Sequence, residues 1–208
     1  MKCILLHGLG QNPSDWNETV NHIGNNLEIF CPDIFQWLPK TDVSYSRLYQ
    51  GLEEYCQQFD EPFVLVGLSL GGMLALQYAA EHSPKVYSLV LIGAQFSIPK
   101  NILKFQNMIF RILPNRAFVK MGIGKKELLA LCNSIMELDF YGDLKHIHCN
   151  TLLLCGKMDK VNQPASIKLN EQIKNSQLIL APNAGHEVNK DNPIELANII
   201  KRFCLGKE

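Results

Sequence analysis

The chain has 208 residues, of which 47% are apolar and 19% are charged, with 20 basic and 20 acidic side chains. This length and balance fit one globular domain and exclude a disordered chain, a coiled coil and a fibrous repeat. Because the net charge is zero, no overall field draws the chain onto nucleic acid or an anionic membrane. We therefore expect a small, mostly uncharged molecule as partner, with no nucleic acid and no membrane.

The N-terminal run and the cysteines bear on the location of the protein. The apolar run 3–6 stops at His7-Gly8 and is too short for a signal-peptide core or a membrane span. Seven cysteines are an odd number, and five of them lie inside apolar stretches. That pattern suits buried thiols in a reducing compartment better than a disulfide framework. We expect a cytoplasmic protein.

Short apolar runs alternate with helical patterns from the N-terminus onward. The runs predict strands at residues 2–7, 27–31, 63–66, 86–92, 151–155 and 178–180. The helical patterns lie at residues 14–26, 44–59, 70–81, 164–173 and 193–204. Strands that are apolar throughout and joined by helices imply a parallel sheet covered on both faces. The predicted fold class is α/β, with a doubly wound, mostly parallel sheet of six strands.

A G-x-S-x-G pattern, Gly67-Leu68-Ser69-Leu70-Gly71, follows the third predicted strand and precedes a helix, as this pattern requires. A sharp, strained turn there lifts the Ser69 hydroxyl above the sheet, and the flanking glycines leave it room. The helix start also favours developing negative charge. We predict Ser69 as a nucleophile; the alternative is a glycine turn with an incidental serine.

A second glycine turn, His7-Gly8-Leu9-Gly10, follows the first predicted strand. At that place the N–H groups of Leu9 and Leu70 are suited to hold the oxyanion of a tetrahedral intermediate. We predict these two amides as the oxyanion hole. Taken alone, the same four residues are only a tight turn before a helix.

A serine hydroxyl needs a base, and histidine suits that task near neutral pH. His186 lies on the turn after the last predicted strand, at the sheet edge where Ser69 is expected. His7 is at the same edge, but we expect it to support the oxyanion turn. The others fall within a helix, at a helix end or at the amino end of a strand: His22, His82, His146 and His148. We predict His186 as the base; the alternative is a solvated loop histidine.

The base in turn needs a carboxylate that fixes its tautomer and stabilises the imidazolium. Asp159 follows the fifth predicted strand, at the same edge of the sheet, and we predict it for this role. The competing interpretation is that Asp159 only caps the following helix, whose start is marked by Asn162 and Pro164. The other carboxylates considered are Asp143, Asp191 and Glu187.

Together these motifs resemble the α/β-hydrolase superfamily, and its carboxylesterase-like serine hydrolases, across nearly the whole chain. The resemblance is carried by HGLG, GLSLGG, the acid in CGKMD and the base in NAGH, in the order Ser69, Asp159, His186. It implies the fold, an ester-type hydrolytic mechanism and the roles given above. The family usually begins with two further strands, so six remain here, in the order 2-1-3-4-5-6. Residues 34–39 replace a usual loop of small residues, which we expect to reshape one wall of the site.

Between residues 95 and 150 the alternation stops, where this superfamily often inserts a helical cap. We predict a core of residues 1–96 and 149–208 and a cap of residues 97–148. Two apolar helical stripes fit the cap, one with Ile102, Phe105, Ile109 and Ile112 and another with Leu128, Leu131, Cys132 and Ile135. The plain interpretation is that both pack the cap onto the core. Additional apolar side chains favour an acyl pocket, with four predicted substrate-binding residues: Phe105, Met108, Ile109 and Met136.

The reaction itself stays open at this point. We predict cleavage of a small to medium carboxylic ester through an acyl-serine, without a cofactor and without a metal. Thioester cleavage, acyl transfer and carbon–carbon bond hydrolysis use the same residues, and a ligand-binding protein on a hydrolase scaffold retains them. His146, His148 and Cys149 span the entry to a buried strand, where side chains alternate between faces, which argues against a metal site there.

Overall fold

A computed structural model describes residues 1–39, 41–97 and 123–206. Six strands form one sheet in the order β2-β1-β3-β4-β5-β6, and all five neighbouring pairs are parallel. The strands are β1 (Lys2–Leu6), β2 (Glu28–Phe30), β3 (Phe63–Leu68), β4 (Val86–Ile92), β5 (Asn150–Gly156) and β6 (Ser176–Ala181). The predicted fold class and the predicted strand order are confirmed.

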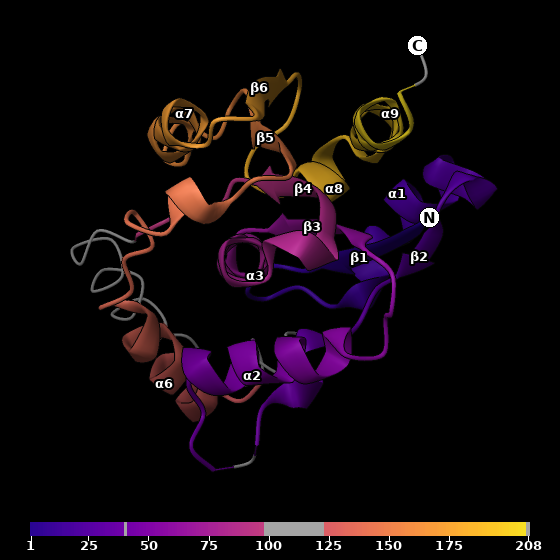
Figure 1. The fold of residues 1–208 in the computed structure, drawn as a ribbon. Coiled ribbons are helices and arrows are strands. Elements are labelled where there is room, and N and C mark those ends of the chain that lie inside the picture. Colours follow the sequence, from indigo (N-terminus) through magenta and orange to yellow (C-terminus); the bar gives the residue numbers. More distant parts are fainter. Residues whose placement is uncertain (40, 98–122, 207–208) are drawn as a thin grey trace.

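Helices cover both faces of the sheet, and this arrangement explains why the inner strands are mostly apolar and buried (Figure 1). The helices are α1 (Asn17–Ile23), α2 (Tyr45–Cys56), α3 (Leu70–Glu81), α6 (Lys125–Ile135), α7 (Gln163–Gln172), α8 (Val188–Asp191) and α9 (Pro193–Leu205). Alternate residues of a strand point to opposite faces. Thus Val64 packs in one cluster with α1 and α9, whereas Leu65 packs in the other with α2, α3, α6 and α7.

The predicted helix at residues 14–26 is three short helical segments. The 3-10 helix η1 (Pro13–Trp16) leads into α1, and η2 (Gly24–Asn26) follows it. Gly24 ends α1 with a φ of 64°, a conformation that glycine adopts without the strain of a β-carbon. The four-residue helix α8 was not predicted, because one turn carries too little periodicity to be seen in a sequence.

Within the predicted cap the structure describes α6 and the 3-10 helix η5 (Leu144–His146). The stripe Leu128, Leu131, Cys132 and Ile135 is buried in the same cluster as α2 and α3, as the plain interpretation predicted. The other stripe, Ile102, Phe105, Ile109 and Ile112, lies outside the described residues. None of the helices in the described ranges is long and apolar enough to cross a membrane.

Candidate active site

The predicted catalytic residues all follow strand ends at one edge of the sheet. Ser69 comes directly after β3, Asp159 follows β5, and His186 follows β6. The carboxyl ends of parallel strands meet at a common edge, and in open α/β sheets ligands bind there. The fold therefore places three chemically suited side chains on the same rim.

Ser69 occupies a strained turn between β3 and α3. Its φ of 54° and ψ of −112° are unusual for a residue with a β-carbon, and its N–H donates to the carbonyl oxygen of Ile92 over 2.9 Å. A β-carbon on Gly71 would collide with the carbonyl oxygens of Leu6 and His7, so glycine there lets α3 approach the end of β1. The turn has the strained geometry that the sequence pattern predicted.

His186 and Asp159 form a short hydrogen bond. The Nδ1 of His186 lies 2.7 Å from Oδ2 of Asp159, whose side chain is only 5% exposed, whereas the imidazole is 39% exposed. Burial alone would raise the pKa of the Asp159 carboxyl, but hydrogen bonds from His186 and Asn162 outweigh it and lower that pKa. The carboxylate stays ionised and holds the proton of the ring on Nδ1, which leaves Nε2 as an acceptor.

Ser69 and His186 both border the end of β4. Ser69 is bound to the carbonyl of Ile92, and the next residue, Gly93, touches the His186 ring. A β-carbon on Gly93 would lie 3.0 Å from Nδ1 of His186, and φ at this glycine is 55°. In the described part of the chain no hydrogen bond links His186 to Ser69; such bonds are often long in unliganded enzymes. Gly93 was missed in the sequence, although its place directly after a buried strand was a signal.

The oxyanion turn lies next to the serine. A β-carbon on Gly8 would be 3.4 Å from the β-carbon of Ser69, so the two turns are in contact. Gln11 closes this turn, since its N–H donates to the Gly8 carbonyl and its side-chain oxygen accepts from the Gly8 N–H, both over 3.2 Å. Leu9 lies in the same turn, and Leu70 begins α3, where an N–H has no acceptor within the helix. Of the two amides predicted for the oxyanion hole, that of Leu70 directly follows Ser69 and that of Leu9 follows Gly8, which lies next to Ser69.

His7 is a buried, neutral histidine that fastens the oxyanion turn. Its Nδ1 donates to the carbonyl of Gly8 over 3.0 Å, and its Nε2 accepts from the N–H of Ile34 over 3.1 Å. Burial lowers the pKa of His7, although the bond to Gly8 and the nearby Asp33 partly offset this. Since Nε2 is already an acceptor, the Asp33 carboxylate 3.4 Å away is not an ion-pair partner of a charged ring. The supporting role expected of His7 fits these contacts.

A buried amide network joins the oxyanion turn to the histidine turn. Nε2 of Gln11 donates to Glu187 over 2.8 Å and to Oδ1 of Asn189 over 3.1 Å. Asn189 returns a bond to Gln11 over 3.3 Å and donates to the carbonyl of Asp15 over 3.1 Å. Both amides are 1% exposed. The sequence carried no local signal for this link between residues at opposite ends of the chain.

The alternative carboxylates have other partners. Glu187 accepts from Gln11 and from Lys190, and Asp191 accepts from the N–H of Gly185 over 2.7 Å. Asp143 precedes η5, at the amino end of β5 rather than at the edge with Ser69. Asp159 also accepts weakly from the N–H of Asn162 over 3.3 Å, so it contacts the helix start as well as His186.

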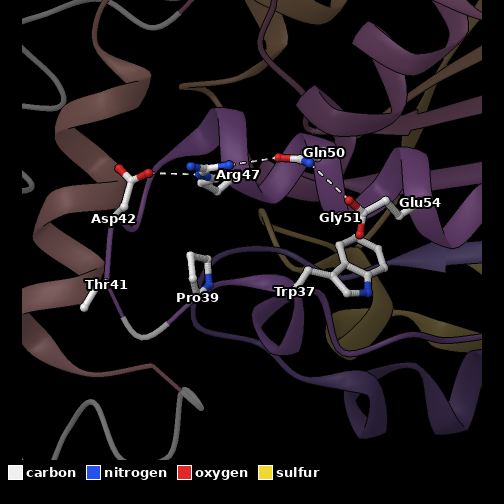
Figure 2. Close-up of a pocket in the computed structure, with 8 residues that line it drawn as sticks. All are labelled: Trp37, Pro39, Thr41, Asp42, Arg47, Gln50, Gly51 and Glu54. Carbon is white, nitrogen blue, oxygen red and sulfur yellow. Dashed lines mark hydrogen bonds and ion pairs between the residues drawn. The ribbon is translucent and has the colours of Figure 1, made fainter.

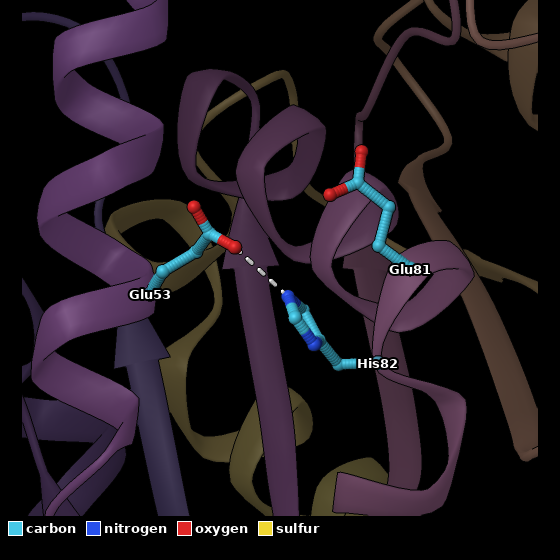
Figure 3. Close-up of side chains that lie close together, drawn as sticks. All are labelled: Glu53, Glu81 and His82. Carbon is cyan, nitrogen blue, oxygen red and sulfur yellow. Dashed lines mark hydrogen bonds and ion pairs between the residues drawn. The ribbon is translucent and has the colours of Figure 1, made fainter.

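Among the described residues one group of three potential metal ligands occurs, Glu53, Glu81 and His82 (Figure 3). His82 Nε2 lies 3.0 Å from Oε1 of Glu53, while Glu81 accepts from Tyr49 over 2.6 Å and from Gln77 over 2.9 Å. These partners account for the cluster without an ion. His82 ends α3, twelve residues and about 18 Å from the start of that helix. It therefore lies at the end of α3 remote from Ser69.

A polar pocket lies beside α2, and none of the catalytic candidates lines it (Figure 2). Its Arg47 is already bound to Asp42 over 2.9 Å and to Gln50 over 3.1 Å. Trp37, which belongs to the unusual loop 34–39, packs on Tyr55 of α2 with ring centroids 5.5 Å apart. That loop reaches the sheet edge through Ile34, which binds His7, rather than through its tryptophan.

Of the four residues predicted for the acyl pocket, the structure describes Met136. Phe105, Met108 and Ile109 lie outside the described residues. Met136 follows α6, is half-buried and packs against the larger core cluster.

Comparison with known proteins agrees with this geometry. Residues 3–199 match the model of the alpha/beta hydrolase family. The chain is 25% identical to alpha/beta hydrolase domain-containing protein VTE7 of Arabidopsis thaliana over 252 aligned residues, which cover 98% of this chain and 74% of that protein. It is 24% identical to monoacylglycerol lipase abhd6-B of Xenopus laevis, covering 96% of this chain and 74% of the relative.

Solved structures share the fold at low sequence identity. MenH from S. aureus superposes with a TM-score of 0.85 at 16% identity, covering 99% of this chain and 94% of MenH. A thermophilic esterase from Thermogutta terrifontis gives a TM-score of 0.84 at 18% identity, covering 99% and 90% of the two chains. With the parallel sheet and a family match over nearly its whole length, this chain belongs to the alpha/beta hydrolase family.

Proposed function

We propose that this protein is a serine hydrolase that cleaves a small to medium carboxylic ester through an acyl-Ser69 intermediate. The observation that carries the proposal is the 2.7 Å bond between His186 and Asp159, on the same rim as the strained Ser69 turn. A hydrolase scaffold of this family implies a small-molecule substrate. The lipase and esterase names among the similar proteins favour an ester.

In the proposed first half-reaction, Oγ of Ser69 attacks the carbonyl carbon and its proton passes to Nε2 of His186. Asp159 stabilises the resulting imidazolium through Nδ1. The carbonyl oxygen gains the negative charge and accepts bonds from the N–H groups of Leu9 and Leu70. When the tetrahedral intermediate collapses, the bond to the alcohol oxygen breaks and the alcohol takes the proton from His186.

In the second half-reaction a water molecule attacks the acyl-enzyme. His186 accepts a proton from the water as its oxygen bonds to the acyl carbon, and returns it to Oγ of Ser69 as the acid departs. The exposure of the imidazole, 39%, is consistent with this step, because substrate and water must both reach it. All atoms are supplied by the ester, the water and the protein.

Labelling with a fluorophosphonate probe tests the nucleophile, and turnover of p-nitrophenyl esters tests the activity. We expect the probe to label the protein and Ser69→Ala to lose both labelling and turnover while still unfolding cooperatively. Labelling without turnover of any ester would instead indicate a ligand-binding protein on a hydrolase scaffold. Equal labelling of Ser69→Ala and the parent protein would exclude Ser69 as nucleophile.

The proposed acyl pocket is tested with the same esters in a series of chain lengths. If the cap binds a modest apolar acyl chain, kcat/KM should rise from acetate towards octanoate, because each buried CH₂ contributes about 0.8 kcal/mol. Equal values for acetate and octanoate would argue against a pocket formed by the predicted residues Phe105, Met108, Ile109 and Met136.

A further inference from the structure

We propose that Asn162 and Gln95 are positioning residues that hold the Asp159 carboxylate in line with His186. The inference rests on the proposed function, because it assigns these two amides to the alignment of the catalytic acid and base. Neither residue was among the predicted site residues. Their contacts connect the ends of β4 and β5 with the histidine turn.

Asn162 stands where an asparagine ordinarily caps a helix, yet its side chain does not cap α7. No side-chain capping bond is formed at this position, although the Asn162 carbonyl accepts from the N–H of Ser166 over 3.1 Å. Instead Nδ2 donates to both oxygens of Asp159, over 2.9 Å to Oδ1 and 2.8 Å to Oδ2. The Asn162 side chain therefore binds the Asp159 carboxylate in place of the N–H group that a capping asparagine usually binds.

Gln95 fixes which way the Asn162 amide faces. Nε2 of Gln95 donates to Oδ1 of Asn162 over 2.7 Å. If the amide were reversed, its oxygen would face the Asp159 carboxylate and its NH₂ group would face the NH₂ group of Gln95. Both contacts would then be repulsive, so Asp159 and Gln95 together keep the donor of Asn162 on the carboxylate.

Gln95 is itself held by a well-supported backbone. It lies just after β4 and next to Phe96, whose carbonyl accepts from the N–H of Phe140 over 2.8 Å. The following residue, Ser97, forms an antiparallel bridge with Asp139. The amide therefore reaches Asn162 from a fixed point outside the loop that carries Asp159.

Without Asn162, the buried carboxylate would lose its orientation. Oδ2 of Asp159 accepts from Nδ1 of His186 and from Asn162, whereas Oδ1 would keep only the weak 3.3 Å bond from the Asn162 N–H. Nδ2 of Asn162 also lies 3.0 Å from Nδ1 of His186, so the two donors converge on one oxygen. Removal of one donor frees the carboxylate to rotate, and the ring that it orients can then move away from Ser69.

The charge of Asp159 responds to the same contact. Burial raises the pKa of this carboxyl, and the bonds from His186 and Asn162 lower it by more. Loss of the Asn162 amide is therefore expected to raise the pKa of Asp159 towards or above its ordinary value. This change is measurable in the folded protein whether or not the protein turns over an ester.

The kinetic test uses Asn162→Ala, Asn162→Asp and Gln95→Ala, with Gln163→Ala as the matched control. Gln163 is the next residue, and among the described residues its side-chain amide donates to the carbonyls of Gly156 and Lys157 and not to the Asp159 carboxylate. We expect kcat to fall about tenfold to a hundredfold in Asn162→Ala with KM changed less than about twofold, as for a misplaced catalytic group. The fall in kcat should be larger in Asn162→Asp than in Asn162→Ala, because a second carboxylate then faces Asp159. It should be smaller in Gln95→Ala than in Asn162→Ala.

A spectroscopic test is independent of activity. The titration of Asp159 is followed by ¹³C NMR of aspartate-labelled protein, assigned by its absence in Asp159→Asn. The midpoint should move to higher pH in Asn162→Ala and Gln95→Ala and stay unchanged in Gln163→Ala. Gln95→Ala keeps this test available if Asn162→Ala does not fold.

Two results would overturn the inference. One is an unchanged kcat and an unchanged Asp159 midpoint in folded Asn162→Ala or Gln95→Ala; the other is an equal loss in Gln163→Ala. A parent protein that neither binds the fluorophosphonate probe nor hydrolyses esters would refute the proposed function, and the NMR titration would still decide whether Asn162 orients the carboxylate.

Discussion

Gly93 and His186 lie so close together that a side chain on the glycine would press against the imidazole. A β-carbon on Gly93 would stand 3.0 Å from Nδ1 and 3.1 Å from Cε1 of the ring, and 3.5 Å from Oδ2 of Asp159. Since the preceding residue, Ile92, binds the N–H of Ser69, the end of β4 is a common support for all three catalytic candidates.

We predict that Gly93→Ala lowers kcat about tenfold to a hundredfold, because the added methyl group has to displace the imidazole by a few tenths of an ångström. The positive φ of 55° adds strain, so the free energy of unfolding should fall by about 1 kcal/mol or more. Gly142→Ala is the control, since a β-carbon there meets nothing within 4 Å. Equal kinetics of the two variants would show that the contact does not matter for activity.

Replacing the carboxylate should distinguish Asp159 from its alternatives. Asp159→Asn is expected to lower kcat about 10⁴-fold, because a neutral amide no longer selects the proton-on-Nδ1 form of His186. Glu187→Gln and Asp191→Asn should each lose far less, since their oxygens bind Gln11, Lys190 and Gly185 rather than the imidazole. Steady-state kinetics of the three variants on one ester measures these losses. A larger fall in kcat in Glu187→Gln or Asp191→Asn than in Asp159→Asn would show that the other carboxylate orients His186.

The amide network between the two turns should contribute to both stability and rate. Gln11→Ala removes the donor to the buried Oδ1 of Asn189 and the acceptor of the Gly8 N–H, at a cost of about 1–3 kcal/mol in the free energy of unfolding. We also expect kcat to fall about tenfold, because the oxyanion turn loses its tie to the histidine turn. Gln36→Ala, at an exposed amide, is the control for urea unfolding and kinetics.

His7 should make the stability of the fold depend on pH. The pKa of His7 is lowered in the folded state, so above about pH 6.5 the ring is neutral in both the folded and the unfolded state. In that range its contribution to the free energy of unfolding is fully present. Below that pH the unfolded chain binds the proton first, and stability is lost as the pH falls through the lowered folded-state pKa.

Urea unfolding from pH 7 to pH 5 measures this effect. His7→Gln should be less stable at pH 7 by about 1–3 kcal/mol, because the bonds to Gly8 and Ile34 are disturbed, yet should lose less stability on acidification. His148→Gln, at an exposed histidine, serves as the control. A slope that is the same in His7→Gln and in the parent protein would contradict the assignment.

The sequence by itself determined the sheet and the place of the serine. Continuous apolar runs and helices with period 3.6 are local patterns, and they predicted the class, the six strands and, with the family resemblance, their order. The turn at Ser69 is equally local, because Gly67 and Gly71 lie within two residues of it. Such features depend on residues that are neighbours along the chain, so they can be predicted without knowing the tertiary contacts.

Only the tertiary structure decided how the supporting residues are used. Asn162 looked like a helix cap, but its side chain binds a carboxylate because Gln95, 67 residues away, holds its amide in one direction. Gln11 and Asn189 are 178 residues apart, and Gly93 has to leave room for His186 in addition to adopting a positive φ. These roles arise where distant strand ends converge, and no pattern of neighbouring residues encodes that convergence.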